Sequence, residues 1–205
     1  MRKLVTNRLL AGATFVACLA AGAVAVAQAP LAIESGRVTL AGTSNVHAYT
    51  ASTTKMRVTR SRVSPVTAGQ DFWDNALKPG AVDGFEITIP SATLTSPKGD
   101  LDKNMHKALK VEQFPEITFR LVRFETKADS AETRAIGMLK IAGIEREVAL
   151  TITTKRAGTG LNVKGTLDLL MTDYGITPPK AMLGMLKTDP KVTITFETVL
   201  AIPTT

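Results

Sequence analysis

Alternation of apolar and polar residues runs through most of the chain after residue 30, and this period of two most constrains the fold. In residues 161–171, apolar side chains occupy one phase while Lys164, Thr166 and Asp168 occupy the other. The same alternation, rich in Thr and Val, recurs over residues 37–42, 46–60, 82–90, 117–126 and 191–200. Because successive side chains of a strand point to opposite faces, each stretch predicts a strand with one buried face.

Two further alternating stretches meet at Ala142-Gly143, which predicts a hairpin there. In the second arm Val148, Leu150 and Ile152 share a face. The whole pattern predicts about eight strands joined by short turns. We therefore expect a mainly β fold, either an antiparallel barrel that is closed or nearly closed, or a sandwich of two sheets.

Two segments depart from this alternation and predict short amphipathic helices. In residues 100–111 the apolar positions recur every four residues, at Leu101, Met105 and Leu109. Residues 178–190 begin with two prolines, end at Asp189-Pro190, and carry three apolar residues on one side: Met182, Leu183 and Leu186. Methionines at this spacing belong either to an ordinary core, which is the commoner case, or to the adaptable lining of an apolar cavity.

The first 29 residues have the pattern of a cleavable secretory signal peptide. A basic start is followed by an apolar run, and Ala27 and Ala29 stand at the −3 and −1 positions of a cleavage site. The run is weakly apolar and no basic stop-transfer cluster follows it, which disfavours a membrane anchor. We expect cleavage after Ala29, one domain over residues 30–205, and a periplasmic or secreted location.

Cleavage would remove the only cysteine, Cys18, and much of the excess positive charge. Cys18 faintly resembles the acylated cysteine of a lipoprotein, but Phe15 at position −3 and the apolar residues that follow favour ordinary cleavage. The net charge would fall from +7 to +4 because three basic residues leave with the peptide. The remaining charges are interspersed, which disfavours nucleic-acid binding and permits mild attraction to an anionic membrane surface. The oligomeric state stays open, a dimer included.

Several motifs follow one another in a recognisable order. They are G-T-S-N-V-H at 42–47, M-H-K-A-L at 105–109, F-P-E-I-T-F at 114–119, and G-M-L-K-I-A-G-I at 137–144. In this order, over nearly all of residues 30–205, they resemble the YceI-like family of exported lipid-binding proteins. The resemblance implies a lipocalin-like antiparallel barrel around a tubular apolar pocket, in which characterised relatives bind polyisoprenoids or similar lipids. The start of the domain and residues 65–79 depart from the family pattern, which bears on the ligand more than on the fold.

A binding pocket of this kind would be lined by the inward phases of the strands and capped by the second predicted helix. The predicted lining residues are Phe119, Leu121, Leu139, Leu150, Leu167, Leu169, Met182 and Leu186. A polar group at the mouth would meet a head group, and the candidates are His47, His106, Arg120 and Lys180. A barrel filled by its own side chains is the alternative, because filled and hollow barrels share the same alternation.

Catalysis is the less favoured interpretation. The two histidines, His47 and His106, could form a metal or acid–base site with a carboxylate such as Asp100, Asp102 or Asp173. Their spacing matches no metal-ligand motif, and the chain has neither a G-x-S-x-G elbow nor a phosphate-binding loop. Hydrogen bonds that hold a loop or a helix end explain both histidines more simply. We predict a non-enzymatic carrier of an isoprenoid or fatty-chain lipid, without cofactor or metal.

Overall fold

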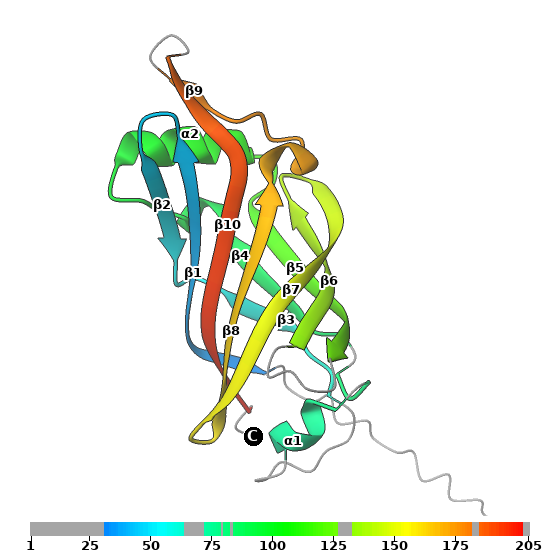
Figure 1. Cartoon of the computed structure of the whole chain (residues 1–205). Coiled ribbons are helices and arrows are strands. Elements are labelled where there is room, and N and C mark those ends of the chain that lie inside the picture. Colours follow the sequence, from blue (N-terminus) through cyan, green and yellow to red (C-terminus); the bar gives the residue numbers. More distant parts are fainter. Residues whose placement is uncertain are drawn as a thin grey trace, which may run out of the picture.

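The computed structural model describes residues 31–63, 72–78, 80–82, 84–126, 133–181 and 185–202. Within these ranges the chain forms ten strands, two α-helices and two 3₁₀ turns (Figure 1). The strands of the first half are β1 (Ala32–Ser44), β2 (Ala48–Thr53), β3 (Arg57–Arg60), β4 (Glu86–Pro90) and β5 (Glu116–Thr126). Those of the second half are β6 (Thr133–Ile141), β7 (Ile144–Ala157), β8 (Gly160–Leu170), β9 (Lys180–Ala181) and β10 (Leu186–Ala201). The helices are α1 (Phe72–Ala76) and α2 (Gly99–Leu109), and the 3₁₀ turns are η1 (Ser91–Thr93) and η2 (Met171–Tyr174).

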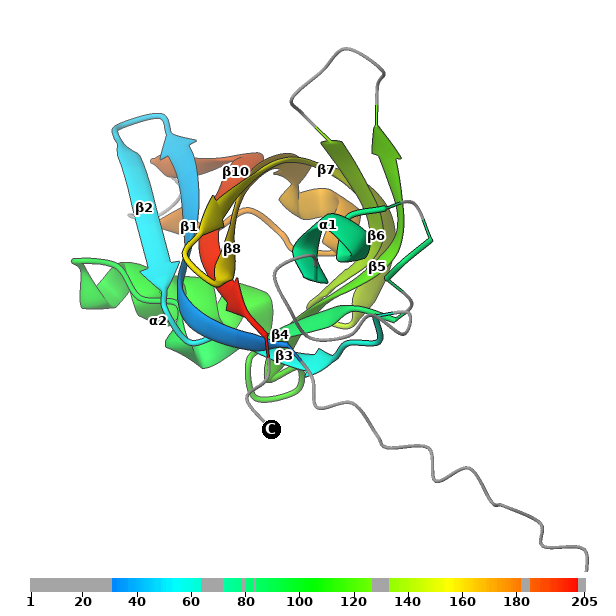
Figure 2. The ribbon, with the colours of Figure 1, turned by 90° about the horizontal axis from the view of Figure 1, so that it is seen from below.

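The strands form one curled antiparallel sheet. Its order is β2-β1-β10-β8-β7-β6-β5-β4-β3, and β9 pairs only with β10. The two edge strands, β2 and β3, follow each other in the chain through residues 54–56, so the sheet curls back on itself (Figure 2). The predicted antiparallel β-barrel is thereby confirmed.

The hairpin predicted at Ala142-Gly143 joins β6 to β7. Both turn residues have positive φ, 48° and 84°, which is the backbone twist that suits a two-residue hairpin. Gly143 is also required by packing, because a Cβ at this position would lie 2.5 Å from the ring of Phe114. That ring belongs to the segment between α2 and β5, so the turn is fixed to a part of the chain distant in sequence.

The described residues of the segment 178–190 do not form the predicted helix. They include β9 and the start of β10, and residues 182–184 lie outside the described part of the chain. The Asn45 side-chain amide donates to the Met185 carbonyl at 2.8 Å, and the Lys187 N–H donates to Asn45 Oδ1 at 2.8 Å. These contacts hold the segment extended beside the turn between β1 and β2, where backbone pairing replaces helical hydrogen bonds. The second helix of the fold is instead α1, within the region 65–79.

The other predicted helix is confirmed as α2, which lies across the upper end of the barrel in Figure 1. Asp102 in its first turn accepts a hydrogen bond from the Ser96 N–H at 2.7 Å and so fixes the chain entering the helix. The stretch 46–60 was predicted as one continuous strand; it is two strands, β2 and β3. Among the described residues, none of the helices combines the length and hydropathy that a membrane span needs.

Candidate ligand-binding cavity

The barrel is hollow, and its interior is a cavity of about 900 Å³. Lining residues extend along β8 from Leu161 to Leu169. The eight residue-to-residue steps between them correspond to about 27 Å of strand, or roughly 20 Å along the barrel axis when strands tilt as they do in barrels. This volume lies near the upper end of the range usual for small-molecule sites, about 300 to 1,000 Å³. The alternating pattern allowed either a barrel filled by its own side chains or a hollow one, and this chain forms the hollow one.

Six residues predicted to line a pocket lie in the wall of this cavity. They are Phe119, Leu121, Leu139, Leu150, Leu167 and Leu169. Met182 lies outside the described residues, and so does the side chain of Leu186. The wall also contains inward residues of the same alternating stretches that the prediction did not single out, among them Val38, Leu40, Ile87, Val163, Ile194 and Phe196.

Two glycines make room for aromatic rings in the wall. Gly137 lies beneath the ring of Phe119, and Gly165 lies beneath the ring of Phe196, its partner across the β8–β10 ladder. A Cβ at either glycine would come within 2.4 Å of the ring. Because both rings border the cavity, these glycines let them lie against the sheet instead of projecting into the lumen.

Helix α2 covers one end of the cavity with its apolar face. Leu101, Met105 and Leu109, the three residues on which the helix was predicted, all border the lumen. Leu109 is buried, whereas Leu101 and Met105 are half-buried. The amphipathic pattern therefore reflects a helix that faces the cavity on one side and solvent on the other.

Polar lining residues gather at this α2 end. They come from the β1–β2 turn, the start of α2 and the vicinity of β9, and we call them the rim: Ser44, His47, Tyr49, Ser96, Lys98, Asp100, Asn104, Lys180 and Thr188. His47 and Lys180, two of the residues predicted at the mouth, thus border the cavity. Tyr49, which was not among the predicted residues, is half-buried, and its burial, with a smaller contribution from the charge of Asp189, raises the pKa of its hydroxyl.

Arg120 was predicted at the mouth, and this prediction is wrong. It lies between two inward residues of β5, so its side chain points to the outer face, and its guanidinium is 3.7 Å from the Glu145 carboxylate. His106 is not part of the cavity wall either. Its Nε2 makes a hydrogen bond of 2.8 Å with the Leu94 carbonyl, which ties α2 to the segment after η1.

The two histidines have separate surroundings. His47 belongs to the β1–β2 turn, where its backbone carbonyl accepts hydrogen bonds from the Ser44 N–H and hydroxyl. His106 has the structural role that was considered as the simpler explanation. Within the part of the chain that the structure describes, no three His, Cys, Asp or Glu side chains are grouped as a metal site would require.

Solved structures of known proteins share this fold. The Burkholderia cenocepacia protein BcnA is similar over 80% of this chain and 95% of its own, with a TM-score of 0.62 and 15% identity. A polyisoprenoid-binding domain from Saccharophagus degradans, implicated in plant cell wall breakdown, is similar over 85% and 99%, with a TM-score of 0.59 and 12% identity. The YceI protein of Campylobacter jejuni is similar over 74% and 85%, with a TM-score of 0.52 and 14% identity. At such identities the likeness concerns the fold alone.

Sequence comparison gives the family. Curated protein sequences provide no significant match. A family model, that of the YceI-like domain, matches residues 35–200, which includes β2 to β9 and almost all of β1 and β10. With four fifths of its length matched by this model, the chain belongs to the YceI-like family.

Proposed function

We propose that the protein binds one long apolar chain, of a polyisoprenoid or a fatty lipid, inside the barrel and performs no chemistry on it. The observation that carries this proposal is the hollow interior of about 900 Å³, walled by aliphatic and aromatic side chains. The similarity to a polyisoprenoid-binding domain from Saccharophagus degradans supports the choice of ligand class.

The energetics favour a chain-like apolar ligand. Each methylene moved from water into an apolar site contributes about 0.8 kcal/mol, so a long chain needs few polar contacts to bind. The polar rim at the α2 end offers Lys98, Lys180 and His47 to a head group. A lipid would then bind with its tail in the lumen and its head group between α2 and the β1–β2 turn.

The cell would use such a carrier outside the cytoplasm. The signal-like residues 1–29 support export, and the net positive charge supports contact with an anionic membrane surface from which a lipid could be loaded. Cleavage after Ala29 would leave a thiol-free binding domain in the envelope or outside the cell.

Native mass spectrometry of protein purified from its own envelope fraction tests the proposal. We expect a mass increment that corresponds to one lipid, and uptake of an added polyprenol or fatty acid by protein stripped of lipid. A variant that narrows the lumen sharpens the test: Gly165→Ala places a Cβ against the Phe196 ring and drives that ring inward. The displaced ring takes up space that the ligand needs, and loss of the room for one methylene costs about tenfold or more in binding, so uptake should fall by about that factor.

Thr166→Ala is the matched control, because Thr166 is the neighbour of Gly165, is exposed on the outer face of β8 and is not part of the cavity wall. It should bind as the unmodified protein does. Recovery of protein without lipid, together with no uptake of either added lipid, would refute the proposed function.

A further inference from the structure

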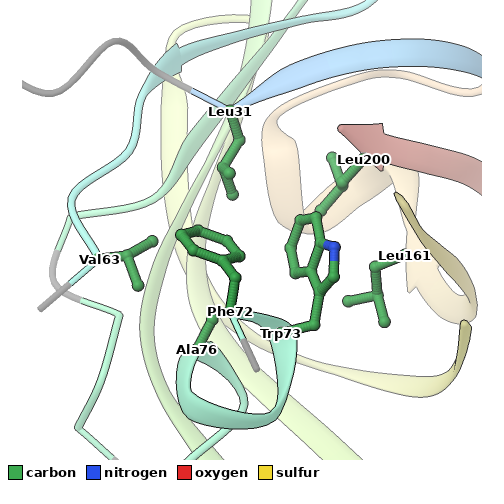
Figure 3. Packing of buried hydrophobic residues seen from close by; sticks show 7 residues of the cluster. All are labelled: Leu31, Val63, Phe72, Trp73, Ala76, Leu161 and Leu200. Atoms are coloured by element: carbon green, nitrogen blue, oxygen red, sulfur yellow. The ribbon is translucent and has the colours of Figure 1, made fainter. Parts of the chain in front are cut away.

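A compact apolar cluster closes the end of the barrel opposite to α2. We call it the floor cluster, and its members are Leu31, Val63, Phe72, Trp73, Ala76, Leu161 and Leu200 (Figure 3). Helix α1 contributes three of them and lies across the barrel opening in the view along the barrel (Figure 2). Each member is at most 7% exposed, so α1 is packed into the barrel and is not merely resting on it.

Two polar contacts fix α1 to the β7–β8 hairpin. The Trp73 indole Nε1–H donates to the Thr159 carbonyl at 2.8 Å, and the Arg156 guanidinium donates to the Asp74 carboxylate at 2.8 Å. The first contact satisfies the one polar group of the indole, which a buried tryptophan requires. The ring is thus held in one orientation at the end of the lumen.

The two aromatic residues of α1 have different relations to the cavity. Trp73 and Phe72 are 2% and 1% exposed, and their rings meet edge to face with centroids 5.1 Å apart. Trp73 borders the lumen together with Ala76, Leu161 and Leu200, whereas Phe72 is absent from the wall. At the α1 end the indole is therefore part of the cavity wall, whereas Phe72 packs against the indole without touching the lumen.

We propose that Trp73 is the floor of the binding tube and sets the longest chain that the protein accepts. This inference rests on the proposed function and adds an orientation and a limit to it. The chain would enter with its tail toward α1 and its polar end toward the rim. A tail too long for the tube would have to displace a buried indole or remain in water, and one surplus methylene at an apolar end wall costs about tenfold or more in binding.

The test compares chain-length preference, with a mixture of straight-chain fatty acids and a mixture of polyprenols as probes. Trp73→Leu should deepen the tube, so that the shortest homologue excluded by the unmodified protein gains about tenfold in relative occupancy. Val63→Ala is the matched control: it alters the same cluster at a residue that is absent from the cavity wall and lies beyond Phe72 as seen from Trp73, so its length limit should not change. Ala76→Leu should fill the floor and shift the limit to shorter chains.

Native mass spectrometry gives the occupancy of each homologue, and thermal denaturation identifies variants that do not fold. If Trp73→Leu fails to fold, Trp73→Phe and Ala76→Leu carry the test with opposite expected shifts. An unmodified protein that binds no chain of any length contradicts the proposed function itself. Binding with the same length limit in the Trp73 and Ala76 variants as in the unmodified protein overturns the role of the floor alone.

Discussion

Tyr174, at the end of η2, shows what a single buried polar atom does in this fold. The residue is 2% exposed and is the largest of the fully buried side chains. Its hydroxyl has no hydrogen-bond partner among the described residues. A buried hydroxyl left in this way costs about 1 to 3 kcal/mol, whereas the ring contributes favourable packing. The packing of the Tyr174 ring therefore stabilises the fold, whereas burial of its hydroxyl without a partner destabilises it.

Tyr174→Phe should accordingly leave the free energy of unfolding unchanged or raise it by about 1 kcal/mol. Tyr174→Ala, which removes the ring as well, should lower that free energy by about 3 to 5 kcal/mol. Urea denaturation of the two variants measures both effects. A large loss of stability in Tyr174→Phe would show that the hydroxyl has a partner after all.

The same residue predicts a pH dependence. Burial first, and the charge of Asp173 second, raise the pKa of Tyr174 to about 12 from 10.0. The neutral form is thus favoured in the folded state, so its contribution to stability is complete below pH 10 and disappears as the pH rises toward 12. We expect stability to fall less steeply between pH 10 and 12 in Tyr174→Phe than in the unmodified protein. Urea denaturation across this interval is the measurement, and equal slopes would contradict the assignment.

At the residue scale the sequence predicted the cavity wall better than its mouth. Phe119 and Leu121 border the cavity as predicted, because strict alternation along a strand assigns each residue to one face of the sheet. Arg120 was misplaced although the same period assigns it to the outer face. The rim depends on which segments meet at one end of the barrel, and Tyr49 reaches it because β2 begins there, next to the turn after β1.

Among the elements, α2 has an unusual C-terminus. The helix ends at Leu109 and is capped by Lys110, whose φ of 53° is a left-handed conformation in which its N–H reaches the carbonyls of His106 and Lys107. Such a conformation costs a residue with a side chain about 1 to 2 kcal/mol, and glycine escapes this cost. The Lys110 side chain is exposed, so little packing would be lost on its removal.

Lys110→Gly should therefore stabilise the protein by about 0.5 to 1 kcal/mol. Lys107→Gly makes the same chemical change within the helix, where glycine costs about 1 kcal/mol, and should destabilise it. The two variants differ only in position, so a comparison of their denaturation midpoints isolates the backbone conformation. An equal loss of stability in both variants would contradict the proposal that the left-handed conformation of Lys110 costs free energy.

The helix predicted at residues 178–190 failed for a reason at the scale of elements. Apolar residues at helical spacing and an initial pair of prolines are a local signal. The contacts that override it come from Asn45, which is 140 residues away from Met185. Helix α1, by contrast, is present but was not predicted, because its five residues are too few to show a helical period.

At the scale of the whole molecule, hollowness is the property that the sequence could not predict. In a filled barrel and in an empty one, the same alternate residues of each strand face the interior. The two barrels differ in the summed volume of these inward side chains. In this protein the inward side chains leave about 900 Å³ of the interior unfilled. Glycines beneath the rings of Phe119 and Phe196 let these rings lie against the sheet, and a helix lies at each end of the lumen. A hollow barrel has lost packing contacts along its wall, and a ligand that binds only the folded state would offset this loss.

The predicted location of the protein outside the cytoplasm also belongs to the scale of the whole molecule, and it depends on residues 1–29. We expect protein produced with its complete N-terminus in a bacterial host to be cleaved after Ala29, so that its intact mass is that of residues 30–205. Cys18→Ser should be processed identically, since ordinary cleavage does not involve the thiol. Replacement of both Ala27 and Ala29 by bulky residues should block cleavage, because the −3 and −1 positions need small side chains. An acylated Cys18 at the mature N-terminus would instead indicate a membrane-tethered barrel, and an uncleaved cytoplasmic chain would refute export.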